Sequence, residues 1–411
     1  MASRRWYLTL LQNGALALLG VLLALAAGEL VLRVYNPFES RVKGYAIQLP
    51  VRQRYLIDNT SNDKLDRQIV HTTNSLGFRG AEPPADPDSV LTIMSIGGST
   101  TECFYLSDGR TWTDALGRLL GKSFAPLWIN NAGLDGQSTF GHLVLLDSIV
   151  RMRAKPRVAF YLIGINDVGN DAPTREDTTL YRRYSVQKAW RQFVTHSEIL
   201  ALGVDIYRYA EARRQGLVQG AAWSIESRQI DLAASERKEI APAEEARLLA
   251  EHRDRYIPAY TSRVRELVRR SRANGIEPIL ITQPVLLGPV KDDVTGVQLG
   301  DIAWHGSNGA VMWKLMELYN DVLRQEALDD SVKVVDLGRE LPKSSRYFYD
   351  NVHYTNEGAE RVAEIIYSSA CPYLAKRYPH YRSGACRAIP APAPRRDSLS
   401  APAVVAASRG K

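Results

Sequence analysis

Cysteine is scarce in this 411-residue chain, which contains only three. Three thiols cannot supply a dense disulfide framework or the four ligands of a structural zinc site. The sequence also has no His-Glu-x-x-His motif and no cluster of Cys and His, so we expect neither a metal nor a cofactor. Whatever chemistry the protein performs is therefore expected to come from ordinary side chains.

Charge of one sign is not in large excess. The chain has 52 Lys and Arg against 45 Asp and Glu, a net charge of +7, with both signs spread along its length. It shows no zinc-finger, basic-zipper or RNA-recognition motif, so we expect no nucleic-acid partner. Apolar residues make up 45% and charged residues 24%, as in an ordinary globular protein, which excludes a wholly disordered or collagen-like chain.

One long apolar segment is present, at the N-terminus. Residues 14–28 read GALALLGVLLALAAG, and the apolar character resumes after Glu29. A membrane span needs about 20 residues, whereas a signal-peptide core takes about 7–15. The stretch from Trp6 to Leu32 is long enough to span, so we predict an uncleaved membrane anchor. A signal cleaved after Ala24-Leu25-Ala26 is the alternative, and a buried helix of a soluble protein is the third interpretation.

The cysteine positions agree with an oxidising compartment, where both membrane interpretations place most of the chain. Cys371 and Cys386 lie close together in the sequence, whereas Cys103 stands apart. The simplest prediction is one disulfide between Cys371 and Cys386. The alternative is three buried thiols.

Composition divides the chain into segments. Residues 1–35 are the anchor or signal, and the polar residues 36–89 resemble a stalk or linker. Residues 90–387 are predicted to form the main domain, interrupted by a helical insertion at 171–257 that is rich in Arg, Glu, Ala and Tyr. Residues 388–411 are rich in Pro, Ala and Ser and are predicted to be a disordered tail.

The main domain alternates short apolar runs with helical patterns. This alternation predicts an α/β fold in which helices cover both faces of a parallel sheet. The predicted strands are Val90–Ile96, Leu127–Asn130, Val158–Ile163, Pro278–Thr282 and Val332–Val335, and the predicted helices are Trp112–Leu120, Thr139–Arg153, Pro258–Asn274 and Gly309–Ala327.

Reactive and polar residues follow the predicted strands. Ser99 comes after the first, Gly136 after the second, Asn166 after the third, and Asp350 with His353 after the fifth. Because open α/β sheets bind ligands at the carboxyl ends of their strands, we expect these residues to meet at one edge. A Ser, a His, an Asp and amide donors are the parts of a serine acyl hydrolase.

Each residue has a distinct expected role. Ser99 is the candidate nucleophile, and His353 is the base that removes its proton. Asp350 orients the imidazole and stabilises the imidazolium. The Ser99 amide, the Gly136 amide and the Asn166 side chain are the candidate oxyanion donors.

Elimination supports His353 as the base. Of the seven histidines, only His353 has an Asp three positions before it. His305, with Asp301 four positions before it, is the rival candidate.

At these blocks the chain resembles the SGNH (GDSL-type) hydrolase superfamily over roughly residues 90–370. The four matching blocks, in order, are GGST with Ser99, NAGLDGQ with Gly136, GIND with Asn166, and DNVH with Asp350 and His353. One position departs from the family motif, since Gly98 stands where the family has Asp.

The resemblance implies a flavodoxin-like three-layer α/β/α fold and hydrolysis of acyl esters through a Ser-His-Asp triad. The anchor and the segment NSLGFRG are similar to a bacterial, membrane-anchored branch, which implies a single-pass inner-membrane protein with a periplasmic catalytic domain, or a secreted one if the signal is cleaved. The expected substrates are O-acyl groups on envelope or exported glycans. An O-acetyltransferase acting on exported polysaccharide and a non-catalytic tethered glycan-binding or assembly module are the alternatives.

Overall fold

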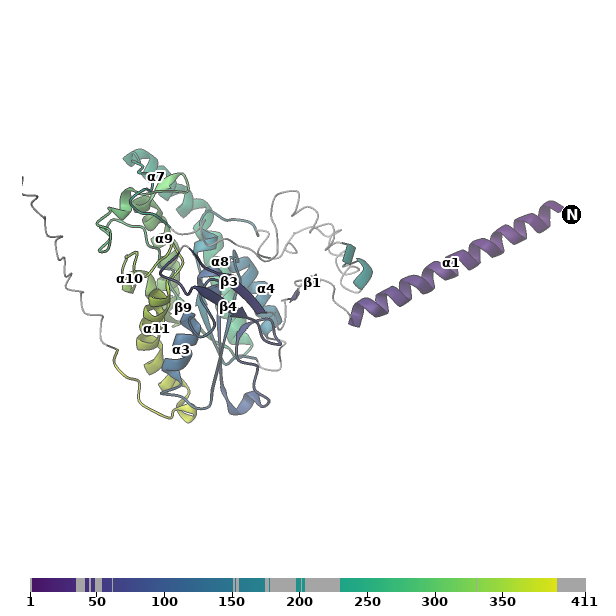
Figure 1. The fold of residues 1–411 in the computed structure, drawn as a ribbon, viewed down its shortest axis with the longest axis horizontal. Helices are drawn as coiled ribbons and strands as arrows, with labels where there is room; N and C mark the ends of the chain where they lie inside the picture. The colour runs from purple at the N-terminus through teal and green to yellow at the C-terminus, as the bar shows by residue number, and fades with distance from the viewer. Residues whose placement is uncertain are drawn as a thin grey trace, which may run out of the picture.

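The computed structural model defines the fold of the main domain (Figure 1). It describes residues 2–34, 41–43, 46–48, 54–60, 62–150, 152, 155–173, 177, 197–200, 202–203, 230–329 and 331–389. Most of the predicted tail and much of the predicted helical insertion lie outside these residues, so both stay predictions there.

A six-stranded sheet forms the centre of the domain, in the spatial order β12-β9-β8-β6-β7-β5. Its strands are β5 (Arg79–Gly80), β6 (Leu91–Gly97), β7 (Leu127–Gly133), β8 (Val158–Leu162), β9 (Glu277–Ile281) and β12 (Lys333–Val335). Five strands are parallel, and only β5 pairs antiparallel, with β7. The parallel strands follow the flavodoxin order, so the predicted fold class is confirmed.

Helices cover both faces of this sheet, which gives three layers (Figure 1). Helices α3 (Trp112–Leu120) and α11 (Asn356–Arg377) pack on one face, and α4 (Thr139–Ile149), α8 (Ile257–Ala273) and α9 (Gly309–Asp329) pack on the other.

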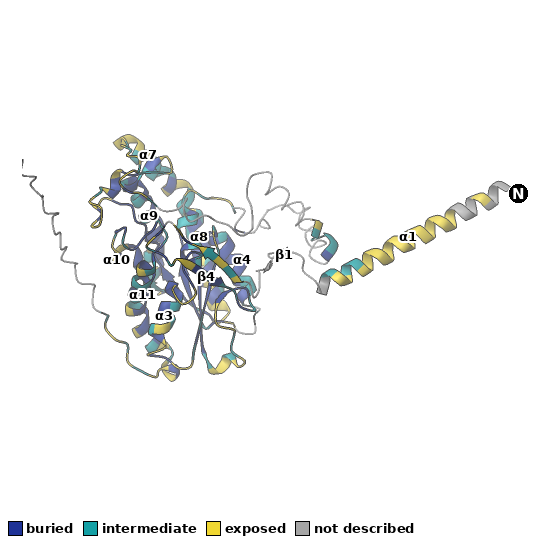
Figure 2. Cartoon of the chain, in the orientation of Figure 1, coloured by how far each residue is buried: buried dark blue, intermediate teal, exposed yellow. Residues whose placement is uncertain are grey.

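Alternation along the strands supplies a separate core to each face. In β6, Ile93 belongs to the core under α3 and α11, while the next residue, Met94, belongs to the core under α4 and α8. All seven residues of β6 are buried (Figure 2). A strand that is apolar on both sides in this way suits a central position in a parallel sheet.

The described part of the expected stalk packs against the domain. Strands β3 (Arg54–Asp58) and β4 (Gln68–Thr72) form an antiparallel hairpin, and Ile69 is fully buried in the core. Asn356 on α11 donates a hydrogen bond to Asp66 in the hairpin loop. In β4 the buried residues are Ile69 and His71, whereas Leu56 in β3 is exposed, so the buried face does not follow a regular alternation of apolar and polar residues that the sequence would reveal.

The N-terminal helix α1 (Ala2–Val34) projects away from the domain (Figure 1). Its apolar segment, Leu11–Leu32, has 22 residues, and its most apolar part is not buried against the rest of the protein. At about 1.5 Å per residue such a segment can cross the roughly 30 Å hydrocarbon core of a bilayer. Near its end, Glu29 accepts hydrogen bonds from the amides of Glu198 and Ile199 in the insertion.

The remaining elements are short or connect the layers. They are β1 (Arg41–Lys43), β2 (Ala46–Gln48), α2 (Ser99–Glu102), α7 (Pro242–Glu251), β10 (Ala303–Trp304), β11 (Ser307–Asn308) and α10 (Leu337–Glu340), the 3-10 turns Pro87–Ser89, Ile165–Asp167, Leu299–Asp301 and Pro379–Tyr381, and a π-helical turn His252–Tyr256 that joins α7 to α8.

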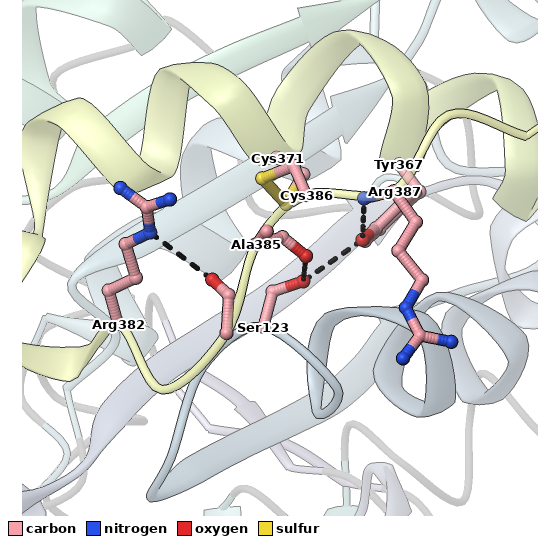
Figure 3. The surroundings of a disulfide bond; sticks show 8 residues. Ser123, Tyr367, Cys371, Arg382, Ala385, Cys386 and Arg387 are labelled. Atoms are coloured by element: carbon pink, nitrogen blue, oxygen red, sulfur yellow. Dashed lines mark hydrogen bonds between the residues drawn. A yellow bond between two sulfur atoms is a disulfide. The ribbon is translucent and has the colours of Figure 1, made fainter.

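The predicted disulfide between Cys371 and Cys386 is confirmed (Figure 3). It ties the segment after α11 back onto that helix, and the Ser123 hydroxyl donates to the Ala385 carbonyl in the same segment. The Tyr367 hydroxyl accepts a hydrogen bond from the Arg387 amide. The disulfide and these hydrogen bonds together hold the segment around Cys386 against α11 and Ser123.

Removing this disulfide is expected to destabilise the domain. A 15-residue separation corresponds to about 3 kcal/mol of unfolding free energy in the chain-entropy account. We expect urea unfolding of a Cys371→Ala/Cys386→Ala variant to show that loss. Reducing agent should destabilise the wild-type protein equally and leave the variant unchanged, and equal stability of both proteins would contradict the expectation.

Candidate active site

Strand β6 ends in a tight turn that places Ser99 at the start of α2. A Cβ atom at Gly97 would lie 2.2 Å from Thr101 Oγ1 and 2.5 Å from the Leu162 carbonyl, so this position requires glycine. At Gly133, a Cβ would lie 2.1 Å from the Glu102 amide. Three strand ends thus approach one another closely around Ser99.

A continuous chain of hydrogen bonds joins Ser99, His353 and Asp350. The Ser99 hydroxyl lies 2.8 Å from His353 Nε2, and His353 Nδ1 lies 2.6 Å from Asp350 Oδ2. The other carboxylate oxygen, Oδ1, accepts from the amides of Val352 at 2.9 Å and His353 at 2.7 Å. In this arrangement an imidazole can take the serine proton while a carboxylate fixes its orientation.

The loop that carries Asp350 and His353 is held at both ends. Tyr349 donates its amide to the His353 carbonyl at 3.0 Å, and the Leu286 amide, just beyond β9, donates to the Asn351 carbonyl at 2.8 Å. The Tyr349 ring stacks on the imidazole, with an interplanar angle of 11°. The loop therefore presents the imidazole in one orientation.

The environment of Asp350 favours its charged form. Burial alone would raise the pKa of this carboxyl group, but the adjacent His353 and the hydrogen bonds to Oδ1 and Oδ2 outweigh burial and leave the pKa below its ordinary value. Asp350 is therefore a carboxylate at neutral pH, able to accept the Nδ1 proton.

Asn166 lies over the turn that precedes Ser99. Its side-chain amide donates to the Gln137 carbonyl at 2.9 Å, and a Cβ on Gly98 would lie 2.5 Å from Asn166 Nδ2. Gly136, next to Gln137, has a φ of 70°, which glycine adopts without strain. Glycine at position 98 thus leaves room for the Asn166 amide next to this turn.

The structure brings the predicted site residues to one end of the sheet. Hydrogen bonds join Ser99 to His353 and His353 to Asp350. The adjoining turns after β8 and β7 carry Asn166 and Gly136, respectively. The rival His305 lies in the turn between β10 and β11, where its ring contacts that of Trp304. Among the histidines that the structure describes, His353 lies within hydrogen-bonding distance of Ser99.

A small pocket that is partly open to solvent adjoins Ser99 and His353. Most of its walls are apolar or aromatic, and sequence reasoning did not identify them, although the aromatic run around Asp350 was a usable signal. The lining residues are Ser99, Thr100, Cys103, Tyr105, Leu106, Tyr349, His353 and Tyr354.

A buried ion pair behind Asn166 was also missed. Asp167 is fully buried and accepts hydrogen bonds from the Thr139 amide and hydroxyl and from Arg263 on α8. Burial raises the pKa of Asp167 to about 6, although Arg263 and Thr139 oppose the rise. This cluster joins the Asn166 turn to the N-terminus of α4.

Within the described ranges, no group of three or more His, Cys, Asp or Glu side chains is placed to hold a metal ion.

Comparison with known proteins identifies the family. Residues 95–361 match the family model of the GDSL-like lipase/acylhydrolase family, a range that contains all five predicted site residues. None of the curated proteins compared with the chain matches it.

Several solved structures resemble the chain at low identity. An α/β hydrolase enzyme, LAE5, from the metagenome of Lake Arreo is 16% identical with a TM-score of 0.36, and the alignment covers 68% of this chain and 94% of LAE5. The acetylxylan esterase Axe2 from Geobacillus stearothermophilus is 15% identical with a TM-score of 0.34, covering 67% of this chain and 91% of Axe2.

The family assignment rests on the family match, which spans well over half of the sequence. The chain therefore belongs to the GDSL-like lipase/acylhydrolase family and is an ester-hydrolysing enzyme of that family.

Proposed function

We propose that the protein is a serine esterase that hydrolyses O-acyl groups through Ser99, His353 and Asp350. The observation that carries this proposal is the hydrogen-bonded chain from the Ser99 hydroxyl through the imidazole to the Asp350 carboxylate. Ser99 and His353, which are 254 positions apart in the sequence, lie at the distance that proton transfer requires.

The reaction proceeds in two steps. Ser99 Oγ attacks the ester carbonyl carbon while His353 Nε2 takes the hydroxyl proton, and the imidazolium then protonates the leaving alcohol oxygen. Water then attacks the acyl carbon of the acyl-enzyme while Nε2 takes one of its protons. The bond between that carbon and Ser99 Oγ breaks, the imidazolium returns the proton to Oγ, and the acid is released. Asp350 stays ionised throughout and stabilises the imidazolium.

The negative charge that develops on the carbonyl oxygen needs donors. In our proposal these are the Ser99 amide, the Gly136 amide and the Asn166 side chain. One Asn166 N–H already donates to Gln137, which fixes the amide plane and leaves the second N–H for the oxyanion. Losing one such donor typically lowers kcat by about 10²–10³-fold.

Gly98→Ala tests the Asn166 assignment. The new Cβ would lie 2.5 Å from Asn166 Nδ2. Because this nitrogen is at the far end of a side chain, we expect the amide to move while the fold stays intact. We expect kcat to fall by about 10²-fold with little change in the free energy of unfolding.

The matched control for Gly98→Ala is the same substitution made in an Asn166→Ala background. If the methyl group acts through the amide, adding it to that variant should cost no further activity. Full additivity of the two losses would contradict the assignment.

The proposed substrates are acyl groups on envelope or exported glycans. The apolar helix α1 and the Cys371–Cys386 disulfide support a membrane-tethered domain in an oxidising compartment, where such glycans occur. The test is to incubate the purified full-length protein in detergent with acetylated glycans, short-chain esters and thioesters. Release of acid from acetylated glycans supports the proposal, and turnover confined to thioesters would refute the substrate class.

The same incubation separates hydrolysis from acyl transfer. With an acyl donor and an unmodified glycan present, mass analysis showing only free acid supports an esterase. Acylated sugar would instead identify an acyltransferase, because the acyl-enzyme is common to both reactions.

We further propose that α1 remains attached and anchors the protein in the bacterial inner membrane with the domain in the periplasm. Mass analysis of the mature protein from membrane fractions should give an N-terminus before Leu11. A soluble protein that begins after Ala26 would show instead that the segment is a cleaved signal.

A further inference from the structure

One residue of the insertion lies inside the domain. Asp177 is fully buried, and its carboxylate lies at the N-terminus of α4, next to the turn that contains Gly136. The carboxylate accepts hydrogen bonds from the Ser138 amide at 2.7 Å, the Ser138 hydroxyl at 2.7 Å and the Gly141 amide at 3.1 Å. These bonds satisfy backbone donors that the first turn of a helix leaves free.

Asp177 acts beside two other side chains that hold the same turn. The Thr139 amide donates to Asp167, and the Gln137 carbonyl accepts from Asn166. Residues 137–139 therefore each have a backbone group bonded to a side chain from another part of the chain. Only the bond to Asp177 comes from the insertion.

The local sequence is shaped to admit this carboxylate. A Cβ on Gly141 would lie 2.8 Å from Asp177 Oδ1, so the approach depends on glycine at that position. The nearby His142 is also buried, and burial lowers its pKa to about 4 although Asp177 opposes the shift. His142 is therefore neutral at neutral pH, and the Asp177 carboxyl group is held by the hydrogen bonds from Ser138 and Gly141 at the N-terminus of α4.

We propose that Asp177 is a positioning residue for the oxyanion hole, through which the insertion holds the turn that carries the Gly136 amide. This inference rests on the proposed esterase function. The Gly136 amide lies two residues before the Ser138 amide that Asp177 binds, so losing Asp177 removes one of the three side chains that hold this turn in place. Oxyanion stabilisation depends on preorganised donors, and a displacement of about 1 Å can cost 10²-fold in rate.

The test compares Asp177→Ala, Asp177→Asn and Asp171→Asn in the full-length enzyme with an aryl acetate substrate. We expect Asp177→Ala to lower kcat by about 10²-fold and to change KM less than about twofold, because the donors act on the transition state. Asn retains an oxygen acceptor for the two amides, so Asp177→Asn should recover most of kcat. Asp171, a partly exposed residue of the same segment that pairs with Arg255, is the matched control and should leave kcat unchanged.

A second variant keeps the inference testable if Asp177→Ala does not fold. Gly141→Ala retains the carboxylate but places a methyl group 2.8 Å from Asp177 Oδ1 and 2.9 Å from the Gln137 side chain, so both must shift. The same selective loss of kcat is expected. Unchanged kcat in a folded Asp177→Ala or Gly141→Ala protein would overturn the inference, as would a rise in KM that accounts for the whole loss of kcat/KM.

The proposed function fails separately from this inference. Absence of ester turnover by the wild-type enzyme, or turnover that survives Ser99→Ala, would refute the esterase mechanism itself. An active, Ser99-dependent enzyme that tolerates Asp177→Ala would refute only the positioning role.

Discussion

Ser99→Ala is expected to lower kcat for an aryl acetate by about 10⁶-fold, the scale seen when a triad nucleophile is removed. The Ser99 hydroxyl is the acceptor of the acyl group in our proposal, and its hydrogen bond to His353 Nε2 at 2.8 Å is lost with it. Ser99 is only partly buried, and the substitution removes a single oxygen atom, so we expect the protein to remain folded.

Two measurements test this prediction: the rate of aryl acetate hydrolysis, and covalent labelling of the protein by a fluorophosphonate. The wild-type protein should be labelled at Ser99, and the variant should not be labelled. Ser368→Ala, which removes an exposed serine hydroxyl on α11, is the matched control and should retain full activity. Comparable turnover by Ser99→Ala would show that another residue carries the acyl group.

Asp350→Asn is expected to lower kcat by about 10⁴-fold, the effect of a wrong imidazole tautomer. The Asn amide can donate to Nδ1, which leaves Nε2 protonated and unable to accept the Ser99 proton. Oδ1 can still accept from the Val352 and His353 amides, so the loop is expected to keep its shape.

The pKa of Asp350 gives this variant a clear reference state. Because the pKa lies below its ordinary value, the wild-type carboxylate stays charged at neutral pH, and Asn removes a charge that is present. The contacts of the Asp350 carboxylate with His353 and the loop amides stabilise the folded protein at pH values above the unfolded-state pKa of this group. That stabilisation is lost as the pH falls through the lowered pKa of the folded state. Asp88→Asn, at an almost fully exposed carboxylate, is the control, and a loss below tenfold for Asp350→Asn would contradict the proposed role.

Short sequence patterns were enough to predict many of the strands and helices of the fold. The predicted strand Val90–Ile96, which the structure places at Leu91–Gly97, is short and apolar on both faces, and Gly97 and Gly98 follow it. This pattern indicates a buried parallel strand without any knowledge of its neighbours. The helix Trp112–Leu120 begins at a capping box formed by Thr111 and Asp114, and its predicted bounds match the structure. The antiparallel β5, of two residues, has too short a pattern to recognise.

The candidate site divides in the same way. Ser99, Asn166 and His353 follow recognisable strands and blocks, so the rule that ligands bind at strand ends predicted where they would meet. Their distances depended on packing between turns, for example the contact of Asn166 with Gly98. The pocket walls, including Tyr105, depend on the same packing and were not predicted.

The sequence by itself determined the alternation of strands and helices, the order of the reactive blocks, the apolar N-terminal segment and the simplest cysteine pair, because each depends on residues close together along the chain. Only the tertiary structure decided that the hairpin before the main domain joins its core and that Asp177 reaches the first turn of α4. Such contacts join distant segments through the shape of the packed surfaces and through buried groups that must find partners, and neither requirement leaves a periodic pattern in the sequence.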